Sequence, residues 1–130
     1  AKERYGTTTQ YEVLPNGEKG PFLAEYVGEF AGGKRHGFGC YETWDGLNYK
    51  GQWADNKRHG EGTQNVAEKL QSTYGYSEYH GEWKDDMKSG HGSMRFGERG
   101  LLLYEGGFVD DLREGQGYIY LTGIEREKDT

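Results

Sequence analysis

The sequence has one cysteine, two prolines and no long apolar run, and these shortages exclude several classes of protein. The lone Cys40 cannot form a disulfide within the chain, which favours a reducing compartment over secretion. The longest aliphatic run, Leu101-Leu102-Leu103, is far shorter than the roughly 20 residues that a transmembrane helix needs. No signal-peptide pattern is present. We therefore expect a cytoplasmic protein, associated with the cytoskeleton or with a membrane surface.

Aliphatic residues are also scarce. Apolar residues make up 32% of the chain against 29% that are charged, too little for a thick two-layer core. Disordered chains are poor in aromatic residues, and the 15% aromatic content here argues against disorder. A thin sheet remains. The net charge of −6 gives no general basic field, so we expect no nucleic-acid partner.

The length of 130 residues suits one compact unit. The chain begins at Ala1 without methionine and ends in a charged string, residues 124–130. We therefore expect it to be a fragment of a longer protein.

Glycine, in contrast, is abundant, and its 23 copies follow a pattern. Four segments align without gaps, and each reads Tyr-x-Gly-x-Trp or Phe, then six residues, then Gly-x-Gly. Such self-similarity at a spacing of 20 to 30 residues is typical of a repeat protein (roughly 20–50 residues per repeat). The segments are Tyr26 to Gly39, Tyr49 to Gly62, Tyr79 to Gly92 and Tyr104 to Gly117.

Each repeat predicts a β-hairpin with one aromatic face. Tyrosine, glycine and the second aromatic residue are two positions apart, so in a strand all three lie on one face. Antiparallel pairing that keeps the faces together would set Phe30 opposite Gly37, Gly28 opposite Gly39 and Tyr26 opposite residue 41. Glycine would leave room for a ring and would allow strong curvature.

The predicted organisation follows from these repeats. Residues 26–48, 49–78, 79–103 and 104–123 form repeats 1 to 4, and residues 124–130 form a charged tail. The second repeat has seven extra residues, where Val66 to Gln71 could form a loop or a short helical turn. Thr7 to Val13, followed by Pro15-Asn16-Gly17, predicts a strand and turn. Residues 1–25 would thus be a cap or half of a degenerate repeat.

The repeats resemble the MORN (membrane occupation and recognition nexus) repeat. The resemblance rests on Tyr-Val-Gly-Glu-Phe, Tyr-Lys-Gly-Gln-Trp and Tyr-His-Gly-Glu-Trp with their Gly-x-Gly partners, and it covers residues 26 to about 123. It implies an all-β fold, an elongated single-layer antiparallel sheet of stacked hairpins with an aromatic groove and frequent dimers. Two positions depart from the pattern, because Ser89 and Glu114 stand where repeats 1 and 2 have histidine.

No residues suggest catalysis, a metal or a cofactor. The equivalent His36 and His59 would lie about 10 Å apart if their strands are two positions apart in the sheet, too far to share one metal ion. The predicted role of these histidines is to hydrogen-bond a neighbouring hairpin. Asp85-Asp86 and Asp110-Asp111 fall in the hairpin connections and are expected to be solvated turn residues.

The aromatic face is the main candidate binding site. A single-layer sheet has no second layer to bury every ring, so part of this face should stay open to a helix or an extended peptide. The predicted self-association site is the apolar alternation Tyr118-Ile119-Tyr120-Leu121, through which we expect a two-fold dimer. The predicted partner-binding residues are Tyr26, Phe30, Tyr49, Trp53, Tyr79, Trp83, Tyr104 and Phe108.

A second candidate surface is basic. Stacked hairpins would align Lys34-Arg35 with Lys57-Arg58 at the rim, where acidic turn residues partly cancel the charge. A solvated rim is the simpler interpretation, and contact with phosphoinositides or an acidic protein is the functional one. Three functions thus remain open: a non-catalytic protein-interaction scaffold, a lipid head-group adaptor, or an accessory segment of a larger enzyme.

Overall fold

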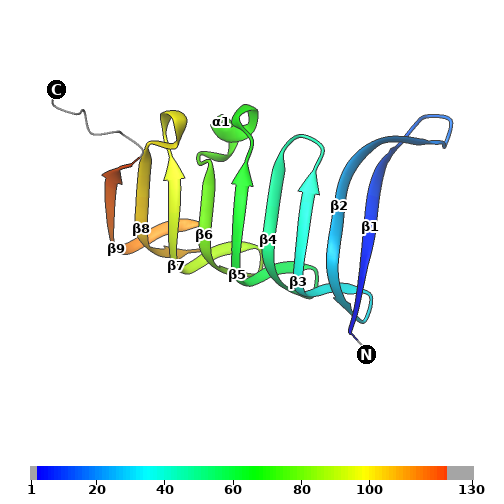
Figure 1. Ribbon diagram of the computed structural model, residues 1–130, viewed down its shortest axis with the longest axis horizontal. Helices are drawn as coiled ribbons and strands as arrows, with labels where there is room; N and C mark the ends of the chain where they lie inside the picture. The colour runs from blue at the N-terminus through cyan, green and yellow to red at the C-terminus, as the bar shows by residue number, and fades with distance from the viewer. Residues whose placement is uncertain (1–2, 123–130) are drawn as a thin grey trace, which may run out of the picture.

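The computed structural model describes residues 3–122 as one open sheet of nine antiparallel strands (Figure 1). Each strand pairs only with its neighbours in sequence, which confirms the predicted single-layer sheet of consecutive hairpins. The strands are β1 Glu3–Val13, β2 Lys19–Ala31, β3 Lys34–Thr43, β4 Leu47–Ala54, β5 Lys57–Val66, β6 Glu78–Lys84, β7 Met87–Phe96, β8 Leu102–Val109 and β9 Leu112–Leu121.

Two-residue turns join the strands of each repeat. The predicted six-residue connection is therefore wrong, because β2 runs to Ala31 and β3 begins at Lys34. Both turn residues have positive φ in every repeat, as in Asp55 (50°) and Asn56 (71°). This is the type I′ geometry, whose twist matches that of the flanking strands. Glycine, asparagine and aspartate tolerate it best, and the sequence places them at all four turns.

A bulge sets the register beyond each turn. The predicted pairs Gly28–Gly39 and Tyr26–Tyr41 are confirmed, but Phe30 lies opposite Arg35 and not opposite Gly37.

Three residues of β3 oppose the single Glu29 in this bulge. The middle one, Gly37, has a φ of +77°, and the Glu29 carboxylate accepts the Phe38 N–H at 2.7 Å. Gln52 and Glu82 repeat that contact in the next two repeats. The extra residues turn Gly37 away from its own hairpin, and its pairing partner is Trp53 of the next one.

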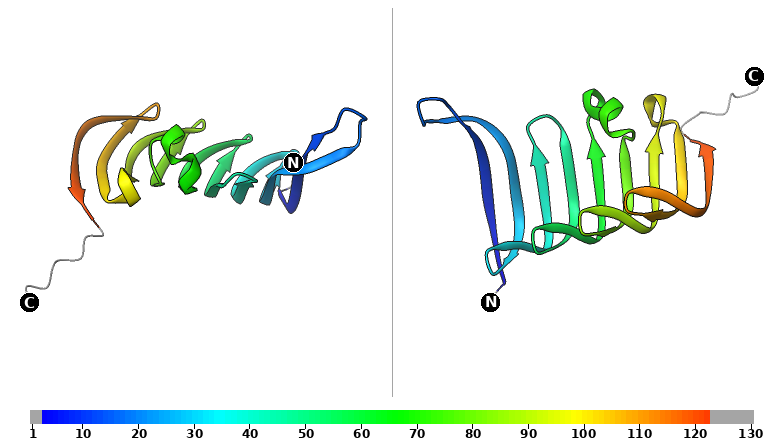
Figure 2. Two further views of the ribbon diagram at one scale, coloured as in Figure 1. Left: turned by 90° about the horizontal axis from the view of Figure 1, so that it is seen from above. Right: turned by 180° about the vertical axis from the view of Figure 1, so that it is seen from behind.

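The sheet bends sharply (Figure 2), and the paired glycines allow the strands to approach closely. A Cβ atom on Gly28 would lie 2.4 Å from the Cα of Gly39, and one on Gly39 would lie 2.2 Å from the Tyr26 hydroxyl oxygen. The same relations recur in the other three repeats. Glycine is required here because the two strands and the tyrosine ring occupy the space of a side chain.

The remaining segments lie at the ends of the strands. The N-terminal strand is longer than the predicted Thr7–Val13, and it pairs with β2 along its length. The insertion in repeat 2 forms the short helices η1 (Glu68–Leu70) and α1 (Gln71–Tyr74), in agreement with a helical turn. Another short turn, η2 (Glu98–Gly100), precedes β8. No helix in residues 3–122 has the length and apolarity required to cross a membrane.

Candidate functional site

A continuous row of aromatic rings runs along the bend of the sheet. Each ring meets the next edge-on, as Trp53 does with Tyr26 (5.4 Å between centroids) and with Tyr49 (5.1 Å). Edge-to-face packing at this distance is favourable. The rings of the row are Tyr26, Trp53, Tyr49, Trp83, Tyr79, Phe108 and Tyr104, and Phe30 extends it beyond Tyr26.

These rings are the core of the protein. The seven rings from Tyr26 to Tyr104 are each at most 5% exposed, and Phe30 is partly buried. The two tryptophans of the row also donate their indole N–H to a glycine carbonyl of the preceding repeat: Trp53 to Gly39 (3.2 Å) and Trp83 to Gly62 (3.1 Å). Neighbouring repeats thus bury these rings although the sheet has no second layer. Their role in partner binding stays a prediction.

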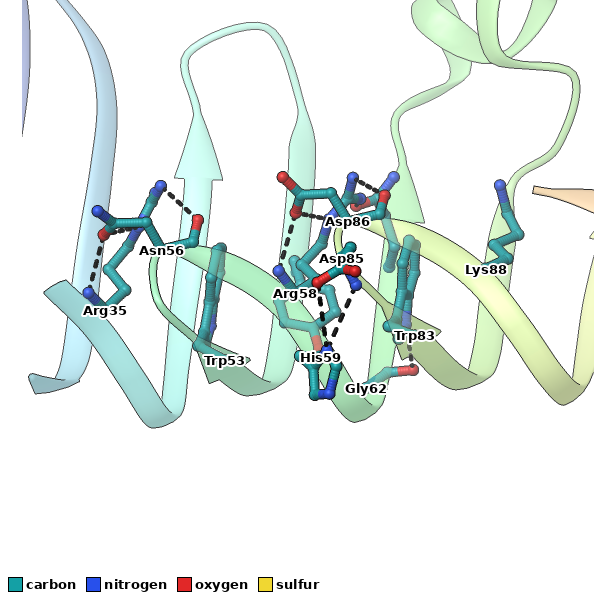
Figure 3. A network of polar contacts seen from close by, with 12 residues as sticks. Arg35, Trp53, Asn56, Arg58, His59, Gly62, Trp83, Asp85, Asp86 and Lys88 are labelled. Carbon is teal, nitrogen blue, oxygen red and sulfur yellow. Dashed lines mark hydrogen bonds and ion pairs between the residues drawn. The ribbon is translucent and has the colours of Figure 1, made fainter. Parts of the chain in front are cut away.

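The second residue of β3, β5 and β7 is basic and lies over this row: Arg35, Arg58 and Lys88 (Figure 3). The Arg58 guanidinium stacks on Trp83 at 4.3 Å, and Arg35 stacks on Trp53 at 4.6 Å. Arg58 also donates from Nε to the Asp86 carboxylate at 3.0 Å and from a terminal nitrogen to the Asp86 carbonyl at 2.7 Å. The two guanidinium groups therefore make their contacts within the sheet, with the aromatic ring below and with the turn of the next hairpin.

The backbone completes this contact, which we call the Arg–Asx clasp. The Arg58 N–H donates to the Asp86 side chain at 2.8 Å, and the Asp86 N–H donates back to the Arg58 carbonyl at 2.9 Å. Arg35 with Asn56, and Lys88 with Asp111, form the same pair of bonds. Aspartates expected only to be solvated in turns thus also join consecutive repeats.

Stacking does align the basic residues, but their environments differ. Lys34 and Lys57 are exposed, whereas Arg35 and Arg58 are partly buried. Lys88, in the same row, is 8% exposed, and its burial lowers its pKa while Asp111 opposes the shift. Of the four predicted rim residues, only the two lysines are therefore exposed.

The histidine and cysteine candidates from the sequence contact other residues of the sheet. His59 Nδ1 accepts the Asp85 N–H of the next hairpin at 3.3 Å, which confirms the predicted contact for this histidine. Within the described part of the chain, no group of three His, Cys, Asp or Glu residues could hold a metal ion. Cys40 is partly buried, and burial, with the nearby Glu42, raises the pKa of its thiol.

An open groove remains on the aromatic face where repeats 1 and 2 meet. It has a volume of about 250 Å³, below the roughly 300–1,000 Å³ of typical small-molecule sites. Its size suits one or two side chains. The lining residues are Arg35, Tyr41, Leu47, Tyr49, Trp53, Asn56, Arg58, Gln64, Tyr74 and Asp86.

One repeat further along, the chain fills the corresponding position with Tyr76. This ring is 5% exposed, accepts a hydrogen bond from Gln64 Nε2 at 2.7 Å and lies 4.2 Å from the Lys88 ammonium nitrogen. Gln64 and Lys88 are the equivalents, one repeat later, of Tyr41 and Arg58 in the open groove. Tyr76 was not among the residues predicted from the sequence. The available signal was an aromatic residue in the insertion, outside the repeat spacing.

Burial of Tyr76 predicts a loss of stability in alkali. Burial raises its pKa from 10.0 to about 12. Folding favours the neutral phenol. The stability linked to this group is therefore fully present below the tyrosine pKa of the unfolded chain, and it is lost as the pH rises through the pKa of the folded chain. We expect the free energy of unfolding, measured with urea, to fall between pH 10 and pH 12. Each tenfold difference in proton affinity between the folded and unfolded chain corresponds to about 1.4 kcal/mol of stability.

The variant Tyr76→Phe should show a shallower fall than the unmodified chain, since it removes one of these titrating groups. Buried Tyr26, Tyr49 and Tyr79 also have raised pKa values, so part of the fall should persist. An identical pH slope in the variant would contradict the assignment to Tyr76.

Comparison with known proteins agrees with this architecture. The family model described as MORN repeat matches residues 26–46, 49–64, 79–98 and 104–120, together more than half of the chain. A search of curated proteins finds no match. The four matches begin at Tyr26, Tyr49, Tyr79 and Tyr104, the tyrosines of the buried row. With four consecutive hairpins of this type in one sheet, the chain belongs to the MORN repeat family.

Proposed function

We propose that this chain is a non-catalytic protein-interaction module that binds an aromatic side chain of a partner's helix or extended peptide in the groove between repeats 1 and 2. MORN repeats are generally modules for interaction with proteins or membranes. The observation that carries the finer proposal is Tyr76, which fills the equivalent site one repeat later.

The walls of the groove suit a ring with a polar tip. Tyr41, Leu47 and Tyr74 supply apolar surface, and the Arg58 guanidinium lies at the same groove. The corresponding cation in the filled site, Lys88, lies against the face of Tyr76. A tyrosine or tryptophan presents a large contact area at low cost in conformational entropy, which is why these residues are frequent in binding hot spots.

The test is selection of peptides from a random phage-displayed library against the folded chain. We expect the selected peptides to share an aromatic residue. Synthetic versions should bind the variants Leu47→Lys and Tyr74→Lys at least about tenfold more weakly, a change of about 1.4 kcal/mol. Tyr74 is 43% exposed, so its variant should fold normally. Fluorescence polarisation measures the affinities.

Phe38→Lys is the matched control, because Phe38 is an exposed apolar residue that does not line the groove. Its affinity should change by less than about twofold, or about 0.4 kcal/mol. Selected peptides without a shared aromatic residue, or equal affinities for all three variants, would contradict the groove proposal.

The lipid alternative stays a prediction. Sedimentation with phosphoinositide vesicles that is lost at high salt and in a Lys34→Glu, Lys57→Glu double variant would favour it. The groove variant Leu47→Lys keeps both exposed lysines. If it still sediments with the vesicles, and high salt still abolishes this, lipid binding does not need the groove.

A further inference from the structure

Among the residues that the structure describes, the last strand, β9, lacks the second neighbour that β3, β5 and β7 have. Within residues 3–122 it pairs with β8 alone, and every residue from Leu112 to Leu121 is exposed. The exposed residues include Ile119 (55%) and Leu121 (61%). An apolar strand edge of this kind is a template for pairing with another strand.

The three interior junctions follow one register. In each, the first glycine of Gly-x-Gly lies opposite the Trp or Phe of the following strand, the second glycine opposite that strand's glycine, and the next inward residue opposite its tyrosine. The pairs at the first junction are Gly37–Trp53, Gly39–Gly51 and Tyr41–Tyr49, and those at the last are Gly90–Phe108, Gly92–Gly106 and Met94–Tyr104.

Each junction also has two contacts that hold the following strand, which is β4, β6 or β8. Its Trp or Phe ring packs edge-on against the tyrosine of the preceding repeat, as Trp83 does on Tyr49 at 5.5 Å. The Asn or Asp of its turn then forms the Arg–Asx clasp with the preceding basic residue. The last repeat has the two residues that would receive these contacts. They are the Tyr104 ring and Arg113, whose guanidinium stacks on Tyr104 at 5.3 Å.

We propose that β9 binds an added strand of another polypeptide that carries Tyr-x-Gly-x-Trp or Phe, followed by an Asn or Asp turn. In the shared register its tryptophan lies opposite Gly115, against the Tyr104 ring, and donates its indole N–H to the Gly117 carbonyl. Its glycine lies opposite Gly117 and its tyrosine opposite Ile119. Its turn carboxylate or amide accepts the backbone N–H of Arg113.

Other occupants supply fewer of these contacts. Residues 123–130 contain no aromatic residue. β9 of a second copy, Leu112–Leu121, contains no tryptophan, phenylalanine, asparagine or aspartate, so it cannot supply the ring and the turn side chain that the following strand supplies at the interior junctions. The two-fold dimer stays a prediction, and light scattering of the chain across a concentration series should return a monomer if the edge selects the strand described above.

The probe is a synthetic peptide of residues 77–86, which contains the β6 motif and its Asp-Asp turn. We expect saturable binding with one site per chain and slower amide hydrogen exchange in β9. Peptides with Trp83→Ala should bind at least about tenfold more weakly and those with Asp86→Ala several-fold more weakly. Mutating the peptide leaves the folding of the protein unchanged.

On the protein side, Arg113→Ala should weaken peptide binding several-fold, through loss of the stacking on the bound ring. Arg4→Ala is the matched control, because Arg4 lies opposite Phe30 in the other edge strand as Arg113 lies opposite Phe108 in β9. It should leave the affinity unchanged. The proposal is overturned by absence of binding, by equal binding of the Trp83→Ala peptide, by protection outside β9, or by a stable dimer that excludes the peptide.

Discussion

Trp83→Ala is expected to lower the free energy of unfolding by about 3–5 kcal/mol, the usual cost of removing a buried aromatic side chain. The Trp83 ring is 3% exposed and packs edge-on against both Tyr79 (5.0 Å) and Tyr49 (5.5 Å). The change also leaves the Gly62 carbonyl without its indole donor and removes the surface on which Arg58 stacks. Chemical denaturation followed by far-ultraviolet circular dichroism measures the effect.

Trp44→Ala is the matched control for this experiment. Trp44 is 62% exposed, and its ring contacts only the Lys69 ammonium group at 5.3 Å among the aromatic and cationic neighbours described. We expect a change within about 1 kcal/mol, as for other surface substitutions. Equal losses at both positions would show that the aromatic row does not form the core.

Gly62→Ala should also be strongly destabilising, by about 3 kcal/mol, the upper part of the usual range for overpacking. An added methyl group would lie 2.1 Å from the Tyr49 hydroxyl oxygen and 2.4 Å from the adjoining ring carbon. The ring cannot easily move, because its hydroxyl donates to the Gln52 carbonyl at 2.8 Å and Trp53 and Trp83 pack against it. Thermal unfolding by calorimetry measures the loss.

Gly6 offers the control, since it lies opposite Gly28 in the same way that Gly62 lies opposite Gly51. A methyl group on Gly6 would meet nothing closer than the Phe30 ring at 3.7 Å, an ordinary contact. Gly6→Ala should therefore be nearly neutral or slightly stabilising. If both substitutions are tolerated, ring crowding does not explain the glycines.

The sequence by itself determined the elements that depend on near neighbours. Alternation of Tyr, Gly and Trp at a period of two identifies strands with one apolar face, so the hairpins were predictable. The opposed glycines Gly28 and Gly39 were predictable for the same reason, and both hold in the structure. The N-terminal strand and the helical turn in the insertion could also be anticipated, although their bounds differ.

Only the tertiary structure decided how the repeats bury one another. The bulge at Glu29 sends Gly37 to the next hairpin, and the bulges of repeats 2 and 3 do the same for Gly60 and Gly90, which a register drawn within one repeat cannot show. The clasp joins Arg58 to Asp86, 28 residues away, and the ring of Tyr76 enters the aromatic face from an insertion. Such contacts depend on how successive hairpins stack in space, so local spacing revealed the hairpins but not the groove and edge that they leave open.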